Sequence, residues 1–243
     1  MKRLTKLIIF AAFLLLISVY ALEAKKTYVA PADIDLTKLL PPPPPQDSTI
    51  TEKEISEILD FQNNRTKQMA DQAAADQDVS VFRFADILGP GFTRERLPFA
   101  SVFFNNVLGN EINITDPAKG FWNRPRPYVF DKRVKPCLNM PVNASYPSGH
   151  SAAGNLIAII LANMIPEKSA AIYARGWEFA MNRVIGGVHY RSDAEAGRMA
   201  ATAIAALMFN DRGFMADYEK SKAELRKALG YAPEPVKTQS VAK

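Results

Sequence analysis

The sequence contains only two histidines, His150 and His189, and each lies within a short run of polar residues. Histidine can act as an acid, a base or a nucleophile near neutral pH, because its ordinary pKa is about 6.5. His150 ends the run Tyr146-Pro-Ser-Gly-His, and His189 lies four residues before Asp193. The histidine chemistry of this protein is therefore confined to two places.

Ser148 and Gly149 directly precede an apolar segment that we expect to be helical. Serine is a favoured helix N-cap, and glycine lets a ligand approach the backbone closely. The free N–H groups at such a helix start attract anions. A Ser-Gly helix start is usually structural when it stands alone, so this motif gains weight only beside the others.

Asp193 can orient His189 if the aspartate begins the helix that follows the Gly186-Gly187 turn. Its carboxylate would accept a hydrogen bond from one ring nitrogen, which fixes the tautomer and leaves the other nitrogen free as a nucleophile. Arg183 ends the preceding helix and is expected to point back toward the same turn. Taken alone, a His-x-x-x-Asp pattern is usually an N-cap beside a surface histidine.

A third segment carries the cations Lys119, Arg124 and Arg126 around a Trp-Asn-Arg-Pro turn. A guanidinium matches the oxygens of a phosphate, and spacing alone does not choose between the two arginines. Zinc bound by the histidines and an aspartate is an alternative. However, three cationic side chains would repel a divalent metal and hold a phosphate dianion. We therefore expect an anion site with no metal and no cofactor.

Helical periodicity and Gly or Pro breaks predict an all-α fold, a single compact multi-helix domain with the active site among helix ends. No stretch alternates long enough to indicate a sheet. The expected helices span about 51–77, 94–109, 114–123, 149–164, 167–185, 192–209 and 213–229.

The order of charge, apolar core and small residues in 1–24 is typical of a secretory signal peptide. Its apolar core is shorter than the roughly 20 residues that span a bilayer, so cleavage and export are favoured over a retained anchor. We expect a proline-rich arm at 25–47, the catalytic domain at 48–231 and a flexible tail at 232–243. Signal removal would lower the net charge from +5 to +3.

The single cysteine, Cys137, excludes an internal disulfide, so the fold must be stabilised by its core. No run of clustered Lys and Arg with interleaved aromatic residues occurs, which argues against a nucleic acid polymer as partner. The apolar helices are too short to cross a bilayer, so we expect no stable membrane insertion.

Three motifs follow one another in the order Lys119-x6-Arg126-Pro, Pro-Ser-Gly-His150, and Arg183-x5-His189-x3-Asp193. This order resembles the three-part signature of the type 2 phosphatidic acid phosphatase and vanadium haloperoxidase superfamily. The small size, the signal peptide and the Leu-Pro-Pro-Pro-Pro stretch resemble more narrowly the bacterial class A non-specific acid phosphatases. The resemblance covers about residues 39–230.

The resemblance implies that His189 attacks phosphorus and forms a phosphohistidine, with Asp193 orienting it. His150 would protonate the leaving alkoxide and then activate water. The implied phosphate-binding groups are Lys119, Arg126, Ser148, the Gly149 N–H and Arg183. Arg126 is preferred to Arg124 only through the spacing of the family. Asn182 stands where the family usually has serine, which puts one supporting hydrogen bond in doubt.

We therefore expect a periplasmic, non-specific acid phosphatase that hydrolyses phosphate monoesters such as nucleotides and sugar phosphates, and that forms a homodimer. The alternatives on the same site are a phosphotransferase, an apyrase-like enzyme, a lipid-phosphate phosphatase and a vanadate-dependent haloperoxidase. A phosphate-binding protein without turnover is the alternative from a different class.

Overall fold

The computed structural model describes residues 25–232, and within this range the chain forms helices and no strand, as the all-α prediction requires. The predicted signal peptide and nearly all of the predicted tail lie outside the described residues. The longer helices are α3 (Thr49–Asn64), α4 (Lys67–Ala75), α6 (Pro98–Trp122), α8 (Gly149–Met164), α9 (Ser169–Ile185), α10 (Arg191–Met208) and α11 (Arg212–Leu229). The short ones are η1 (Pro31–Asp33), α2 (Leu36–Leu39), η2 (Val81–Phe84), α5 (Ala85–Leu88), α7 (Pro127–Phe130) and η3 (Pro166–Lys168).

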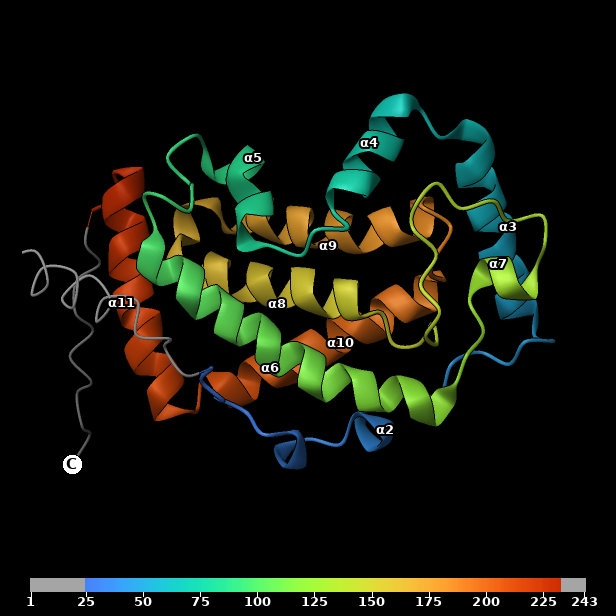
Figure 1. The fold of residues 1–243 in the computed structure, drawn as a ribbon, viewed down its shortest axis with the longest axis horizontal. Helices are drawn as coiled ribbons and strands as arrows, with labels where there is room; N and C mark the ends of the chain where they lie inside the picture. The colour runs from blue at the N-terminus through green and yellow to red at the C-terminus, as the bar shows by residue number, and fades with distance from the viewer. Residues whose placement is uncertain (1–24, 233–243) are drawn as a thin grey trace, which may run out of the picture.

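Helix α8 forms the centre of the bundle (Figure 1). It packs along α9 and α10, and α6 crosses it from another side. Helix α11 packs against the N-terminal part of α6. Nearly every side chain of α8 is buried, because its sequence is apolar around the whole circumference. In the described part of the chain, no helix is both long and apolar enough to cross a membrane.

Helix α6 is continuous where the sequence predicted two helices, at 94–109 and 114–123. The polar residues near the expected break contact the N-terminal arm: the side-chain oxygen of Asn110 accepts hydrogen bonds from the backbone N–H groups of Tyr28 (2.7 Å) and Val29 (3.0 Å). The amide of Asn110 also donates to the carbonyl of Asn106 (2.8 Å), one turn earlier in the same helix. Asn110 therefore fastens the arm and does not end the helix.

Helices α3 and α4 are separate where one long helix to about residue 77 was predicted. The Thr66 hydroxyl accepts from the backbone N–H of Met69 (3.2 Å) and so caps a new helix. Arg65 between them is extended, and its guanidinium donates to the carbonyl of Ile185 (2.7 Å). A cap and a contact with the end of α9 thus turn the chain here.

Gly197 lets α10 approach the start of α8, where the predicted site residues lie. A Cβ at this position would collide with the Ser148 carbonyl oxygen and lie 2.7 Å from Ser151 Cβ. A larger side chain would therefore push α10, which carries Asp193, away from α8.

We predict that Gly197→Ala lowers the free energy of unfolding by about 1–3 kcal/mol, as overpacking of a close contact does. Gly120→Ala is the matched control, since Gly120 is also helical but a Cβ added there would have no heavy atom within 4 Å. That control should gain about 0.5–1 kcal/mol from helix propensity. Urea unfolding curves measure both values, and equal stabilities for the two variants would contradict the close-packing argument.

Candidate active site

A cavity of about 250 Å³ lies among the ends of α6, α8 and α9. Six of the eight predicted site residues line it, and the other two, Ser148 and Asp193, are fully buried beside it. The six are Lys119, Arg126, Gly149, His150, Arg183 and His189. The three motifs, which are far apart in the sequence, therefore meet at one cavity.

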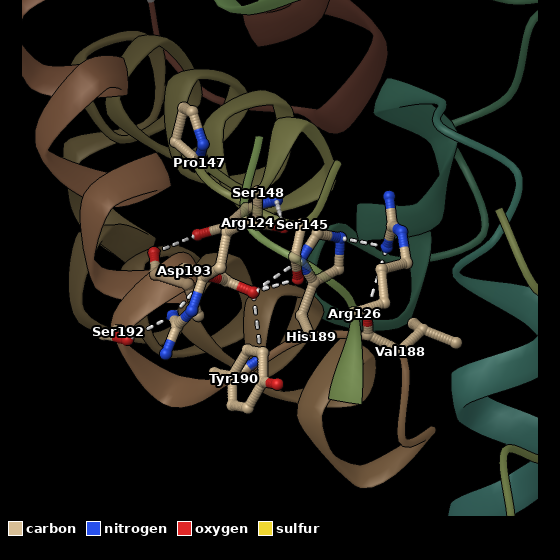
Figure 2. A network of polar contacts seen from close by, with 12 residues as sticks. Arg124, Arg126, Ser145, Pro147, Ser148, Val188, His189, Tyr190, Ser192 and Asp193 are labelled. Carbon is tan, nitrogen blue, oxygen red and sulfur yellow. Dashed lines mark hydrogen bonds and ion pairs between the residues drawn. The ribbon is translucent and has the colours of Figure 1, made fainter. Parts of the chain in front are cut away.

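His189 is held between a carboxylate and a guanidinium (Figure 2). Its Nδ1 lies 3.1 Å from Asp193 Oδ2, and its Nε2 lies 3.0 Å from Arg126 Nη1. Arginine can only donate, so Nε2 must accept and Nδ1 must carry the proton that Asp193 binds. Burial lowers the pKa of His189 well below its ordinary value, although the hydrogen bond to Asp193 opposes this shift. His189 is therefore a neutral imidazole whose lone pair lies on Nε2.

The Asp193 carboxylate is completely buried and fully hydrogen-bonded. It accepts from Arg124 Nη1 (2.7 Å), from the Tyr190 backbone N–H (2.9 Å) and from the Ser145 hydroxyl. Burial alone would raise its pKa, but the hydrogen bond from His189 and the charge of Arg124 bring the pKa well below the ordinary range. Asp193 is the third residue of α10, so the capping turn of that helix sets its position.

The two arginines that spacing could not separate occupy different places. Arg124 lies behind the cavity, where it pairs with Glu54 (3.0 Å) and Asp193 and stacks on the Tyr190 ring at 3.8 Å. Arg126 lines the cavity, and its guanidinium also donates to the carbonyl of Val188 (2.9 Å). Arg126 is thus placed to meet an anion, and Arg124 is placed to compensate buried carboxylates.

Arg183 has buried N–H groups without a partner: its Nε and Nη1 lack any hydrogen bond. Burial first, and then the nearby charge of Arg126, lower its pKa to about 10. The same two causes lower the pKa of Lys119 to about 8, and Lys119 Nζ donates to the Pro147 carbonyl. Cations brought together in this way, with donors left over, provide the charge and hydrogen bonds that an anion needs.

The N-terminus of α8 adds backbone donors to this cationic wall. The Ser148 hydroxyl caps the helix by accepting from the Ser151 N–H (3.2 Å), while the Ser148 N–H donates to the Asp193 carbonyl (3.0 Å). Gly149 lines the cavity at the first position of the helix. The cap thus fixes the helix start, as expected, and leaves the Gly149 backbone beside the anion site.

His150 follows on the same turn and is partly buried. Its Nε2 lies 3.2 Å from the carbonyl oxygen of Gln77, so this nitrogen carries a proton. Burial first, and then the charge of Arg183, lower the pKa of His150 to about 3. Burial has the larger effect of the two, and it depends on packing that the spacing of the motifs does not reveal.

Glu111 is a cavity residue that the sequence reasoning missed. Its side chain is 1% exposed, and its Oε1 accepts from the Thr115 hydroxyl (2.8 Å). Burial raises its pKa to about 8, although Thr115 and Lys119 oppose the shift. The i, i+4, i+8 spacing of Glu111, Thr115 and Lys119 places them on one helix face, and this signal could have revealed it.

The side chains around the cavity favour an anion over a metal ion. Within residues 25–232, no three His, Cys, Asp or Glu side chains are grouped as metal ligands. Lys119, Arg126 and Arg183 face the cavity instead, and their positive charges and N–H donors suit a tetrahedral oxyanion.

We predict that Glu111→Gln makes phosphate binding less sensitive to alkaline pH. The raised pKa keeps Glu111 neutral below about pH 8, and ionisation above it adds a negative charge beside the bound anion. In the parent, the inhibition constant of inorganic phosphate should therefore rise above about pH 8. In Glu111→Gln this rise should be smaller, by a factor of up to about ten. The loss of charge from Lys119 remains in both proteins.

The measurement is competitive inhibition by phosphate from about pH 6 to about pH 9. Asp116→Asn is the control, because Asp116 lines the same cavity on the same helix but is exposed to solvent. It should move the pH at which the affinity falls much less than Glu111→Gln does, because Asp116 has the smallest influence on the pKa of Glu111. Identical pH profiles for Glu111→Gln and the parent would contradict the prediction.

Comparisons with known proteins give a consistent result. Residues 99–214 match the model of the PAP2 superfamily. The chain is 33% identical over 199 residues to a non-specific acid phosphatase of Salmonella typhimurium, with 78% of each chain covered. It is 34% identical over 185 residues to an acid phosphatase of Zymomonas mobilis, covering 71% of this chain and 70% of that protein.

The fold is also similar to a solved structure, that of a bacterial vanadium-dependent iodoperoxidase. The TM-score is 0.55 at 21% identity, with 71% of this chain and 52% of the other covered. That likeness concerns the all-α fold alone. The sequence relatives go further: they show an enzyme that hydrolyses phosphate monoesters. The chain belongs to the class A non-specific acid phosphatases of the PAP2 superfamily.

Proposed function

We propose that this phosphatase works through a phosphohistidine on His189, with His150 as the general acid and base. The observation that supports the proposal most strongly is that the lone pair of His189 Nε2 and the unpartnered donors of Arg183 line the same cavity. His189 Nε2 accepts only from Arg126 in the cavity, and Arg183 keeps two buried N–H groups without a partner. A phosphate group would supply the missing acceptors and place phosphorus before the nucleophile.

In the first step, the oxygens of the phosphate accept hydrogen bonds from Arg183, Lys119 and the Gly149 N–H. One oxygen replaces His189 as the acceptor of Arg126, which frees the Nε2 lone pair. Nε2 then bonds to phosphorus as the bond to the leaving oxygen breaks. The hydrogen bond to Asp193 stabilises the positive charge that develops on the ring, and the cations stabilise the charge on the equatorial oxygens.

His150 gives a proton to the leaving oxygen in this step and takes one from water when the phosphohistidine is hydrolysed. Its pKa of about 3 in the free enzyme means that protonation must accompany substrate binding. A phosphate dianion favours that protonation, because it offsets the charges of Arg183, Lys119 and Arg126. This coupling favours work at acidic pH.

Broad specificity for nucleotides and sugar phosphates, export to the periplasm, assembly as a homodimer and independence of metal ions are further parts of the proposal. A phosphotransferase would use the same site, with an alcohol replacing water in the second step. A substrate panel on the purified mature protein would distinguish apyrase-like and lipid-phosphate activities from the proposed phosphomonoesterase activity. The fixed tautomer of His189 favours turnover over phosphate binding alone, since mere binding needs only donors and cations.

We predict that His189→Ala lowers turnover by more than about 10⁴-fold while the fold survives, because no other described side chain in the cavity is placed to carry the phosphoryl group. Rapid quench of the parent with labelled substrate should trap an acid-labile, base-stable phosphoenzyme. His150→Ala is the control, and it should still form this label with p-nitrophenyl phosphate. A stoichiometric label of acid-stable type, on serine, would contradict the assignment.

We also predict that EDTA leaves the activity intact, because cationic side chains take the part that a metal plays in other phosphatases. Vanadate, a mimic of the five-coordinate transition state, should inhibit competitively. Initial rates before and after dialysis against chelator provide the measurement. Loss of activity with recovery on adding zinc or magnesium would overturn this part of the proposal.

A further inference from the structure

A buried ionic cluster lies beside the cavity, and phosphate binding does not explain it. Its centre is Asp76, the C-cap of α4, which is completely buried. The carboxylate accepts two hydrogen bonds from Arg175 (2.7 and 2.9 Å), one from Arg83 (3.0 Å) and one from the amide of Asn182 (2.7 Å). None of these four residues lines the cavity.

The residue after Asp76 connects this cluster to the cavity. The Gln77 carbonyl binds His150 Nε2 at 3.2 Å, and the Gln77 side-chain oxygen accepts from the Asn139 N–H at 2.9 Å. The carbonyl can only accept, so His150 Nε2 is its donor and Nδ1 is the nitrogen left to exchange protons. Asp76 therefore anchors the turn that sets the tautomer of His150.

The Gln77 carbonyl also counters the groups that disfavour a protonated His150. Burial and the charges of Arg183 from α9, Lys119 from α6 and Arg126 from the segment before α7 all lower the pKa of His150, whereas the Gln77 hydrogen bond raises it. Glu111 faces the same cavity, but its raised pKa keeps it neutral at acidic pH. A small displacement of this carbonyl would remove the hydrogen bond that supports the acid form.

The cluster reaches the phosphate site at a second point. Asn182 directly precedes Arg183 on α9, so its hydrogen bond ties the end of that helix to the same carboxylate. The charge of Asp76 also raises the pKa of Arg183, against burial and Arg126, which lower it. Asn182, which stands where the family usually has serine, thus donates a hydrogen bond to this carboxylate.

We propose that Asp76 is a positioning residue for the general acid: it fixes the Gln77 carbonyl on His150 Nε2–H so that Nδ1–H faces the leaving oxygen. The inference rests on the proposed function. In the step concerned, His189 Nε2 bonds to phosphorus, the bond from phosphorus to the leaving oxygen breaks, and the His150 Nδ1 proton moves to that oxygen. In the second step, a water oxygen bonds to phosphorus as the bond from phosphorus to His189 Nε2 breaks, which returns the lone pair to Nε2, and the proton of the water moves to His150 Nδ1.

The test measures, under single-turnover conditions, how fast two different substrates phosphorylate the Asp76→Asn variant. An alkyl phosphate needs its leaving oxygen protonated, whereas p-nitrophenyl phosphate hardly does. The variant should slow phosphorylation by the alkyl phosphate about tenfold or more beyond its effect on the aryl phosphate, within the roughly 10²–10⁴-fold worth of a general acid. Both rates come from the same active sites, so their ratio does not depend on how much of the protein is folded.

The pH profile gives a second readout. Loss of the Gln77 hydrogen bond lowers the pKa of His150 further, so the alkaline limb of the alkyl phosphate profile should move to lower pH in Asp76→Asn. Asp86→Asn is the matched control, since Asp86 also binds Arg175 (2.8 Å) but is half exposed and does not adjoin Gln77. This control should have the same ratio of rates with the two substrates as the parent, and the same alkaline limb in its pH profile.

Asn182→Ala removes one of the four donors to Asp76 and carries the test if Asp76→Asn does not fold. It should shift the substrate ratio in the same direction by a smaller factor. The inference would be overturned if the folded Asp76→Asn and Asn182→Ala variants kept the parent's ratio of rates with the two substrates. It would also be overturned if Asp76→Asn changed that ratio further in a protein that already carries His150→Ala. If His150→Ala slows phosphorylation by the two substrates to the same extent, the acid role of His150 fails instead, which separates the two proposals.

Discussion

The fold depends on burying the carboxylate of Asp193 within hydrogen-bonding distance of His189. An ionised carboxylate without contact to water is costly unless its charge and its lone pairs are both matched. Here Arg124 supplies the charge, and the Ser145 hydroxyl, the Tyr190 N–H and His189 Nδ1–H supply further donors. These donors come from separate segments, so α10, the turn before it, and the loops around residues 124 and 145 must all meet at one point.

The same arrangement recurs at the second histidine, with one difference. Behind His189 the carboxylate binds the ring directly, whereas behind His150 the carboxylate of Asp76 acts through the Gln77 carbonyl. Anionic groups thus lie behind both histidines, while Arg183 and its neighbouring cations face the cavity. Two buried N–H groups of Arg183 have no hydrogen-bond partner among the described residues, so they are available to an anion.

The sequence predicted the helical class and the motif residues around the cavity because both depend on local signals. Ser148 and the Gly186-Gly187 turn mark helix ends, and the motifs lie at those ends. Other features depend on contacts between distant segments. Asn110 lies where the sequence predicted a break between two helices, but in the structure it stays helical and binds the N-terminal arm. The part played by Gln77 follows from a backbone carbonyl, which leaves no trace in residue type.

His189 is a neutral imidazole with its proton on Nδ1 and its lone pair on Nε2, and its proposed role as nucleophile depends on this state. With only two histidines in the chain, ¹⁵N-labelled imidazoles give two spin systems, and His150→Ala identifies the signals of His189. Two-bond ¹H–¹⁵N spectra of the free enzyme should show a protonated Nδ1 and an unprotonated Nε2, and no titration near pH 6.5, because burial lowers the pKa of His189. A proton on Nε2, or titration at the ordinary pKa of histidine, would contradict the account.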